Sequence, residues 1–215
     1  MKNRRYRIGA VLFDFDGTLT RPGALDFKTM RQAIGCPAGM PMLEFIQSIS
    51  DRARRRTARR RLEAFEIEGS KASQANPGAS ALIARLKAQG MPMGIVTRNS
   101  RASVLRAMEN FERIHVDDFD LILTRDDPLP LKPSGAGIVW AAGRLKQDVD
   151  EILMVGDFIF DMQAGRAAGA LTALLDPRQS PDLAETICDF RIRHLKEIEA
   201  IVNAGLPPAG GKTTG

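Results

Sequence analysis

Two aspartates, Asp14 and Asp16, directly follow an apolar stretch at residues 8–13. A run of this kind, rich in Val, Leu and Ile, predicts a buried strand, and Gly17 predicts that the strand has ended there. Because side chains alternate along a strand, both carboxylates can point the same way. Carboxylates this close repel each other, and a hard cation such as Mg²⁺ would relieve that repulsion. A strand end with two solvated acids is the alternative interpretation.

Later stretches carry further polar side chains that could join the two aspartates, namely a hydroxyl, a lysine and two more carboxylates. The candidates lie at predicted strand ends or in the loops beyond them: Thr97, Lys132, Asp157 and Asp161. Each has an ordinary structural alternative when taken alone. A threonine at a strand end is usually structural, a Lys-Pro pair usually lies in a surface loop, and two acids at a helix start favour its amino end.

The order of these stretches resembles the haloacid dehalogenase-like (HAD) superfamily. Residues 14–18, Asp-Phe-Asp-Gly-Thr, resemble its first motif, and residues 95–97 resemble the second. Lys132 with Pro133 resembles the third motif, and residues 156–161 resemble the fourth. The match spans residues 14 to 161, and the cap position and layout look most similar to the phosphoglycolate phosphatase-like members.

The resemblance implies a role for each of these side chains. Asp14 would be the nucleophile that forms an aspartyl-phosphate, and Asp16 would be the general acid and base. Thr97 would donate to a phosphate oxygen, and Lys132 would neutralise charge on the aspartate and phosphate. The resemblance further implies a Mg²⁺ site formed by Asp14, the backbone carbonyl of Asp16, Asp157 as a direct ligand and Asp161 as a weaker one.

Four residues beside these motifs are predicted to contact substrate: Gly17, Thr18, Arg98 and Asn99. For Arg98 and Asn99, a solvated loop is an equal alternative. Asp16 bears on the reaction type, because the dehalogenases of the superfamily lack this second aspartate. Phosphatase or phosphomutase chemistry is therefore favoured.

Apolar runs alternate with helical patterns, which predicts an α/β fold with a doubly wound parallel sheet. We expect a Rossmann-like HAD core at residues 1–20 and 75–206, with a small helical cap inserted after the first strand, at residues 21–74. The core should contain strands at about residues 93–97, 121–124, 152–155, 171–175 and 189–192. Residues 207–215, rich in Pro, Gly, Lys and Thr, are expected to be disordered.

The predicted cap carries seven arginines within residues 52–61. A solvated helix face is the commonest outcome for such a run. Capture of a second anionic group on the substrate ranks next, because arginine binds carboxylates and phosphates bidentately. Nucleic-acid binding ranks last, because aromatic residues for base stacking are sparse there.

Composition limits the remaining classes. The chain has 215 residues, 44% apolar and 27% charged, and a net charge of +5 that favours acidic partners. It contains no apolar run long enough to cross a bilayer, and its two cysteines form no close pair, which fits a reducing compartment such as the cytoplasm. We expect a Mg²⁺-dependent phosphatase acting on a small phosphorylated metabolite, without membrane or nucleic-acid partners. The alternatives are a phosphomutase of the superfamily and a catalytically idle HAD-fold binding or regulatory protein.

Overall fold

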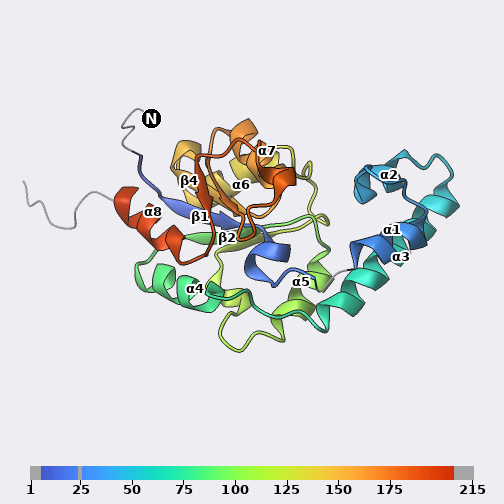
Figure 1. Ribbon diagram of the computed structural model, residues 1–215, viewed down its shortest axis with the longest axis horizontal. Helices are drawn as coiled ribbons and strands as arrows, with labels where there is room; N and C mark the ends of the chain where they lie inside the picture. The colour runs from blue at the N-terminus through green and yellow to red at the C-terminus, as the bar shows by residue number, and fades with distance from the viewer. Residues whose placement is uncertain (1–5, 24–25, 206–215) are drawn as a thin grey trace, which may run out of the picture.

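A computed structural model describes residues 6–23 and 26–205, built around a six-stranded sheet (Figure 1). The strand order is β3-β2-β1-β4-β5-β6, and every neighbouring pair is parallel. The strands are β1 (Ala10–Phe13), β2 (Met93–Val96), β3 (Leu121–Leu123), β4 (Ile152–Gly156), β5 (Leu171–Leu175) and β6 (Phe190–Ile192). This order, with helices on both faces, confirms the predicted doubly wound α/β class.

Helices cover both faces of the sheet (Figure 1). One face packs against α4 (Ala79–Ala88), α5 (Arg101–Met108) and α8 (Glu197–Gly205), and the other against α6 (Ala136–Leu145) and α7 (Ile159–Ala168). Side chains of β1 alternate between the two layers: Val11 and Phe13 enter one cluster, whereas Ala10 and Leu12 enter the other. Burial on both faces explains why these strands read as continuous apolar runs.

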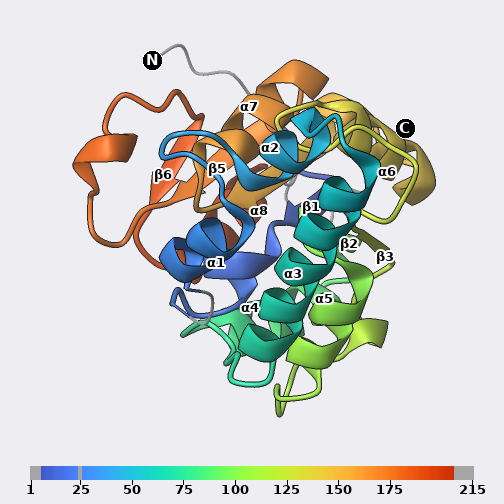
Figure 2. The same cartoon turned by 90° about the vertical axis from the view of Figure 1, so that its right-hand side faces the viewer.

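Three helices stand to one side of the sheet and share a separate apolar cluster (Figures 1 and 2). They are α1 (Phe27–Ile34), α2 (Met42–Ser48) and α3 (Arg52–Ser70). Asp26 and Asp51 cap α1 and α3 by accepting hydrogen bonds from the backbone N–H groups of Thr29 and Arg54, at 3.0 and 2.7 Å. These caps fix both helix starts where the sequence changes from turn residues to helical spacing.

The two chain segments that lead from the sheet to the three helices and back run antiparallel and pair with each other. Thr20 and Ala75 form an isolated bridge, and the N–H of Arg21 donates to the carbonyl of Gln74. The chain between β1 and this bridge forms a kinked turn, Phe15–Leu19, in which Asp16 and Gly17 depart from helical backbone angles. Only a simple turn at Gly17 was expected there. Three further short helical turns were also missed: Val116–Asp118, Val149–Glu151 and Pro181–Leu183.

The other boundaries differ from expectation by a residue or two. Ser134 lies two residues before the first residue of α6, and its hydroxyl accepts from the N–H of Ala136. Gly135 intervenes because it packs on α7, where a Cβ would lie 2.5 Å from the backbone nitrogen of Ala168. Among the described residues, no helix is long and apolar enough to cross a membrane. The tail expected to be disordered lies outside the described residues.

Candidate active site

The polar residues of the site come from the carboxyl ends of three adjacent strands. Asp14 follows β1, Thr97 follows β2 and Asp157 follows β4, and these strands are neighbours in the order β2-β1-β4. Ligands of open α/β sheets bind at this edge, near the point where the strand order reverses. The parallel register therefore gathers side chains that are far apart in sequence.

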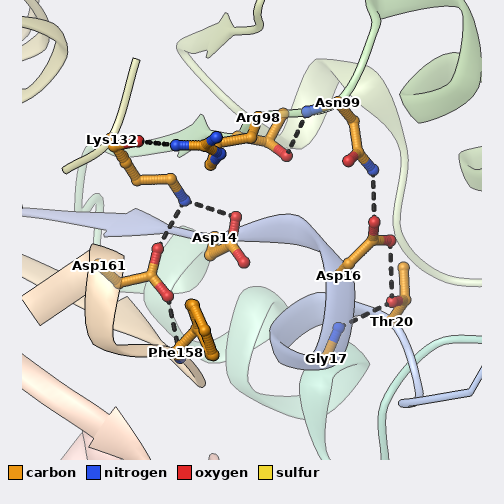
Figure 3. A network of polar contacts seen from close by, with 10 residues as sticks. Asp14, Asp16, Gly17, Thr20, Arg98, Asn99, Lys132, Phe158 and Asp161 are labelled. Carbon is orange, nitrogen blue, oxygen red and sulfur yellow. Dashed lines mark hydrogen bonds and ion pairs between the residues drawn. The ribbon is translucent and has the colours of Figure 1, made fainter. Parts of the chain in front are cut away.

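Lys132 links two of the acids (Figure 3). Its Nζ donates to Oδ1 of Asp14 and to Oδ1 of Asp161, both at 2.6 Å, and its side chain is only 4% exposed. Burial alone would lower the pKa of Lys132, but the carboxylates of Asp14 and Asp161 raise it above its ordinary value. The lysine therefore carries a positive charge directly beside Asp14.

Three carboxylates form a compact cluster at this edge. Asp14, Asp157 and Asp161 each offer an oxygen within 4.8 Å of the others. Burial, with the negative charges of Asp14 and Asp161, raises the pKa of Asp157 to about 8. Burial also raises the pKa of Asp161 to about 6, although Lys132 opposes the shift. Burial and the repulsion between the carboxylates therefore both favour the protonated forms of Asp157 and Asp161.

Two glycines leave room for these carboxylates. Gly17 has a φ of 75°, and a Cβ there would lie 1.9 Å from Oδ2 of Asp157. A Cβ on Gly156 would lie 2.3 Å from Oδ2 of Asp161. The backbone must therefore approach the acids more closely than any side chain allows. The N–H of Phe158 fixes Asp161 further by donating to its Oδ2 at 3.1 Å (Figure 3).

Asp16 lies in a different environment from Asp14 (Figure 3). The amide of Asn99 donates to its Oδ2 at 2.6 Å, and the hydroxyl of Thr20 donates to its Oδ1 at 3.4 Å. Burial raises the pKa of Asp16 to about 7, the charges of Asp14 and Glu66 add to this rise, and the two hydrogen bonds oppose it. Asp16 can therefore exchange a proton near neutral pH.

Arg98 joins the sheet edge to α2. Both oxygens of Glu44 accept from its Nη2 at 2.7 Å, and the carbonyl of Lys132 accepts from its Nη1. Its guanidinium lies 4.9 Å from the ring centre of Phe160. Arg98, predicted to contact substrate, thus pairs with protein groups through both Nη1 and Nη2, although it still lines the site.

A cavity of about 580 Å³ opens between the sheet edge and helices α1, α2 and α3. The acids, Lys132, Thr97, Arg98 and Asn99 form its floor. Apolar residues form most of the rest of its lining: Pro22, Phe27, Met30, Met40, Pro41, Met42, Leu43, Leu62, Phe158 and Phe160. Among the described residues, the lining includes none of the seven arginines at residues 52–61.

One predicted substrate contact lies away from the cavity. Thr18 is fully buried and does not line it, because the turn at Phe15–Leu19 directs this side chain into the interior. Its carbonyl instead accepts from the amide of Asn76, which also holds the carbonyl of Gly17. Gly17 and Asn99 both line the cavity. Figure 3 shows their hydrogen bonds around Asp16, from Asn99 to Asp16 and from the N–H of Gly17 to Thr20.

Glu66 is a further acid of the cavity wall that was not predicted from the sequence. It is 5% exposed, and its Oε1 accepts from Arg125. Its Oε2 has no hydrogen-bond partner among the described residues. The available signal was helical spacing, because Glu66 follows Leu62 by four residues and shares the buried side of α3. Its partner, 59 residues away, gave no such signal.

Comparisons with known proteins agree with this arrangement. Residues 11–175 match the family model of the haloacid dehalogenase-like hydrolases. An uncharacterized hydrolase of Saccharomyces cerevisiae is 33% identical over 91% of each chain, and a phosphoglycolate phosphatase of Nitrosospira multiformis is 27% identical over 91% of this chain and 96% of its own. The crystal structure of a predicted phosphoglycolate phosphatase from Haemophilus somnus has a TM-score of 0.70 at 19% identity, covering 90% of this chain and 97% of the other.

The chain belongs to the haloacid dehalogenase-like hydrolase family. It is an enzyme of the hydrolase class. The matched region begins inside β1 and ends with β5, so it contains every acid of the cluster at the sheet edge.

Proposed function

We propose that this protein is a Mg²⁺-dependent phosphomonoesterase that works through an aspartyl-phosphate on Asp14. The observation that carries the proposal is the pairing of two acids in unlike environments. Asp14 is held by Lys132 at 2.6 Å beside two further carboxylates, whereas Asp16 is half-buried and has a pKa raised to about 7. Acids whose environments differ in this way can divide the roles of nucleophile and proton carrier.

The donor set fits a divalent cation of the Mg²⁺ type. Asp14, Asp157 and Asp161 bring oxygens within 4.8 Å of one another, and oxygen atoms are the ligands that Mg²⁺ prefers. We assign the site to these three residues with the backbone carbonyl of Asp16. When bound, Mg²⁺ would neutralise the carboxylates and the phosphate oxygens around the reacting phosphorus.

In the first step we assign Asp14 as the attacking group. One of its carboxylate oxygens forms a bond to phosphorus while the bond from phosphorus to the ester oxygen breaks. Lys132, at 2.6 Å, holds the carboxylate in place and offsets its charge. The leaving alkoxide takes a proton, and we assign protonated Asp16 as the donor.

In the second step the same groups act in reverse order. Water attacks the phosphorus of the aspartyl-phosphate, and Asp16, now ionised, takes the proton from that water. The bond between phosphorus and the Asp14 oxygen breaks, which releases phosphate and restores the free carboxylate. The hydrogen bond from Asn99 at 2.6 Å keeps Asp16 oriented through both steps.

Thr97 and Gly17 complete the phosphate site in this proposal. Both line the cavity at the sheet edge, where the hydroxyl of Thr97 can donate to a phosphate oxygen. We further propose that residues 21–74 act as a cap over the site. The separate apolar cluster of α1, α2 and α3, and the share of the cavity wall that these helices supply, support this role.

The substrate is a small phosphorylated metabolite in this proposal, and the cytoplasm is the expected compartment. A relative named as a phosphoglycolate phosphatase supports the substrate class, and the free thiols of Cys36 and Cys188 support the compartment. The phosphomutase and the catalytically idle protein remain the alternatives that the experiment must separate.

The test is turnover of an aryl phosphate with Mg²⁺, followed by single-turnover trapping of labelled phosphate and peptide mapping. We expect hydrolysis that EDTA abolishes, and label on Asp14. Mg²⁺ should also raise the thermal midpoint of the wild type but not that of Asp157→Asn, which gives a readout independent of activity. Label on another residue, or full turnover in EDTA, would contradict the mechanism. Transfer of the phosphate to a second substrate hydroxyl would favour a mutase.

A further inference from the structure

The cavity is larger than a phosphate group needs, so its walls bear on the rest of the substrate. Its volume of about 580 Å³ lies within the range of pockets that hold small organic ligands. The phosphate and cation would occupy only the floor, at the carboxylate cluster. The remaining space faces the ten apolar residues named above.

The cations in this lining are mostly engaged by protein groups. Among the described residues they are Arg21, Arg31, Arg98 and Lys132. Lys132 pairs with two carboxylates, and Arg98 pairs with both oxygens of Glu44. Nη1 of Arg31 donates to the carbonyls of Pro37 and Met40, at 2.6 and 2.5 Å. Arg21 is exposed, on the loop that leads to α1.

The arginines of α3 do not add to the cavity. The buried side of this helix consists of Ala58, Leu62, Glu66 and Ser70, each four residues after the last. The arginines at residues 52–61 lie off this line, six exposed and Arg55 half-buried. The charged group that α3 does place in the wall is an acid, Glu66, whose partner is Arg125. Apart from the exposed Arg21, a second anion on a substrate would therefore meet mainly apolar surface and a carboxylate.

We infer that the cavity selects phosphate esters of a bulky, mainly apolar alcohol over esters that carry a second anionic group. This inference rests on the proposed phosphatase function and narrows its substrate class. Burial of an apolar alcohol against Phe27, Leu43 and Leu62 is favourable. Burial of a second carboxylate against this apolar surface is costly. A small phosphate ester that carries a carboxylate, such as phosphoglycolate, should therefore be a poor substrate.

Three esters of primary alcohols separate these effects: benzyl phosphate, 4-carboxybenzyl phosphate and ethyl phosphate. Their leaving groups are similar, so kcat/KM reports mainly on the cavity. We expect benzyl phosphate to exceed both of the others by about tenfold or more, which is the usual scale for a few buried carbon atoms. Equal or higher kcat/KM for 4-carboxybenzyl phosphate would overturn the inference and leave the phosphatase activity standing.

A cation introduced in the apolar wall should shift the preference. Phe27 lines the cavity but is 54% exposed, so Phe27→Lys should fold. We expect the ratio of kcat/KM for 4-carboxybenzyl over benzyl phosphate to rise about fivefold or more. The control is Trp140→Lys on α6, where the tryptophan is 42% exposed and outside the lining, and where the ratio should not change. An unchanged ratio in Phe27→Lys would contradict the placement of the alcohol.

Binding of non-hydrolysable phosphonates separates the failure of this inference from the failure of the proposed function. Calorimetry with Mg²⁺ should give a Kd for benzylphosphonate about tenfold below those of methylphosphonate and 4-carboxybenzylphosphonate. If these affinities appear but no ester is hydrolysed, the inference holds and the proposed function fails. If benzylphosphonate binds no better than methylphosphonate, the inference fails whatever the turnover.

Discussion

The sheet edge and the three-helix region place their charges in opposite ways. At the sheet edge Lys132 and Asp161 are almost completely buried, and each is held by an oppositely charged side chain. On α3, most arginines face outward while Ala58 and Leu62 are buried. Burying charge costs free energy that apolar packing does not. We infer that the sheet edge keeps its buried charges for chemistry, at a cost in the free energy of folding. The helical region instead buries apolar side chains and exposes its charges.

Among the described residues, ion pairs link the two regions, and their apolar clusters are separate. Arg98 binds Glu44 of α2, and Arg125 binds Glu66 of α3. The apolar cluster of α1, α2 and α3 contains residues 30–65 only, separate from the clusters on the two sheet faces. Substitutions in each region should therefore have separable effects, on turnover in one and on substrate preference or stability in the other.

The largest effect should come from Asp14→Asn. This change removes the attacking carboxylate and one member of the acid cluster, so turnover should fall to the assay background and no phospho-enzyme should form. Single-turnover trapping of labelled phosphate measures both. Asp120 also lies outside the cavity lining, but its carboxylate accepts a hydrogen bond from the N–H of Met93, so Asp120→Asn is a less suitable control. Asp150→Asn, in the turn before β4, is the better control and should keep wild-type turnover. Undiminished activity in Asp14→Asn would remove the sheet edge from the chemistry.

Asp16→Asn should have the next largest effect and a different character. It keeps Asp14 and the backbone carbonyl of residue 16, and removes only the proton carrier. Loss of one general acid–base group costs ~10²–10⁴-fold in rate. The first step should suffer less with an aryl phosphate than with an alkyl phosphate, because a good leaving group needs little protonation. Phospho-enzyme should accumulate in the trapping assay, and equal losses for both esters would contradict the assignment.

The sheet edge was the more predictable region, for a physical reason. Asp14, Thr97 and Asp157 each follow an apolar run, and parallel strands bring their carboxyl ends to one edge. The fold could be predicted from the alternation of strands and helices. The residues on the floor of the cavity could be predicted from the order of the motifs. Thr18 shows the limit of this reasoning, because adjacency to Gly17 gave no information on which way the turn directs its side chain.

The helical wall was less predictable because its geometry depends on long-range pairing. Glu44 and Arg98 are 54 residues apart, and nothing local in either segment indicates the contact. The direction of α3 was partly accessible, since Ala58 and Leu62 are the small and apolar positions at helical spacing within an otherwise charged helix. With this spacing the arginines face outward and Glu66 faces inward. The spacing alone therefore favours a solvated helix face over substrate capture by the arginines.

The pair between Arg98 and Glu44 should have a moderate effect. The two side chains are 19% and 40% exposed, so we expect a coupling of about 0.5–1 kcal/mol, mainly in KM. Arg98→Ala, Glu44→Ala and the double variant form the cycle that measures it. The exposed pair Arg106–Glu109 on α5 provides a matched control with no effect on KM. Strictly additive effects of the two substitutions would show that this pair does not link the regions.

Substitutions of the seven arginines at residues 52–61 should have the smallest effect on activity. Arg55 and Arg61 donate to the carbonyls of Ile49 and Ala33 at 3.1 and 2.9 Å, whereas Arg59 is exposed. Replacement of either of the first two by Ala should lower the free energy of unfolding by about 0.5–1.5 kcal/mol, because a carbonyl loses its donor.

Arg59→Ala should change the free energy of unfolding by no more than about 0.5 kcal/mol, as is usual for exposed positions. All three variants should keep kcat/KM within about twofold for benzyl and 4-carboxybenzyl phosphate, because none of these arginines lines the cavity. Urea unfolding and the two-substrate assay measure these quantities. A rise in KM confined to the carboxylated ester in Arg59→Ala would mean that α3 turns its charged face toward the substrate. The opposition between a charged floor and an apolar wall would then have to be abandoned.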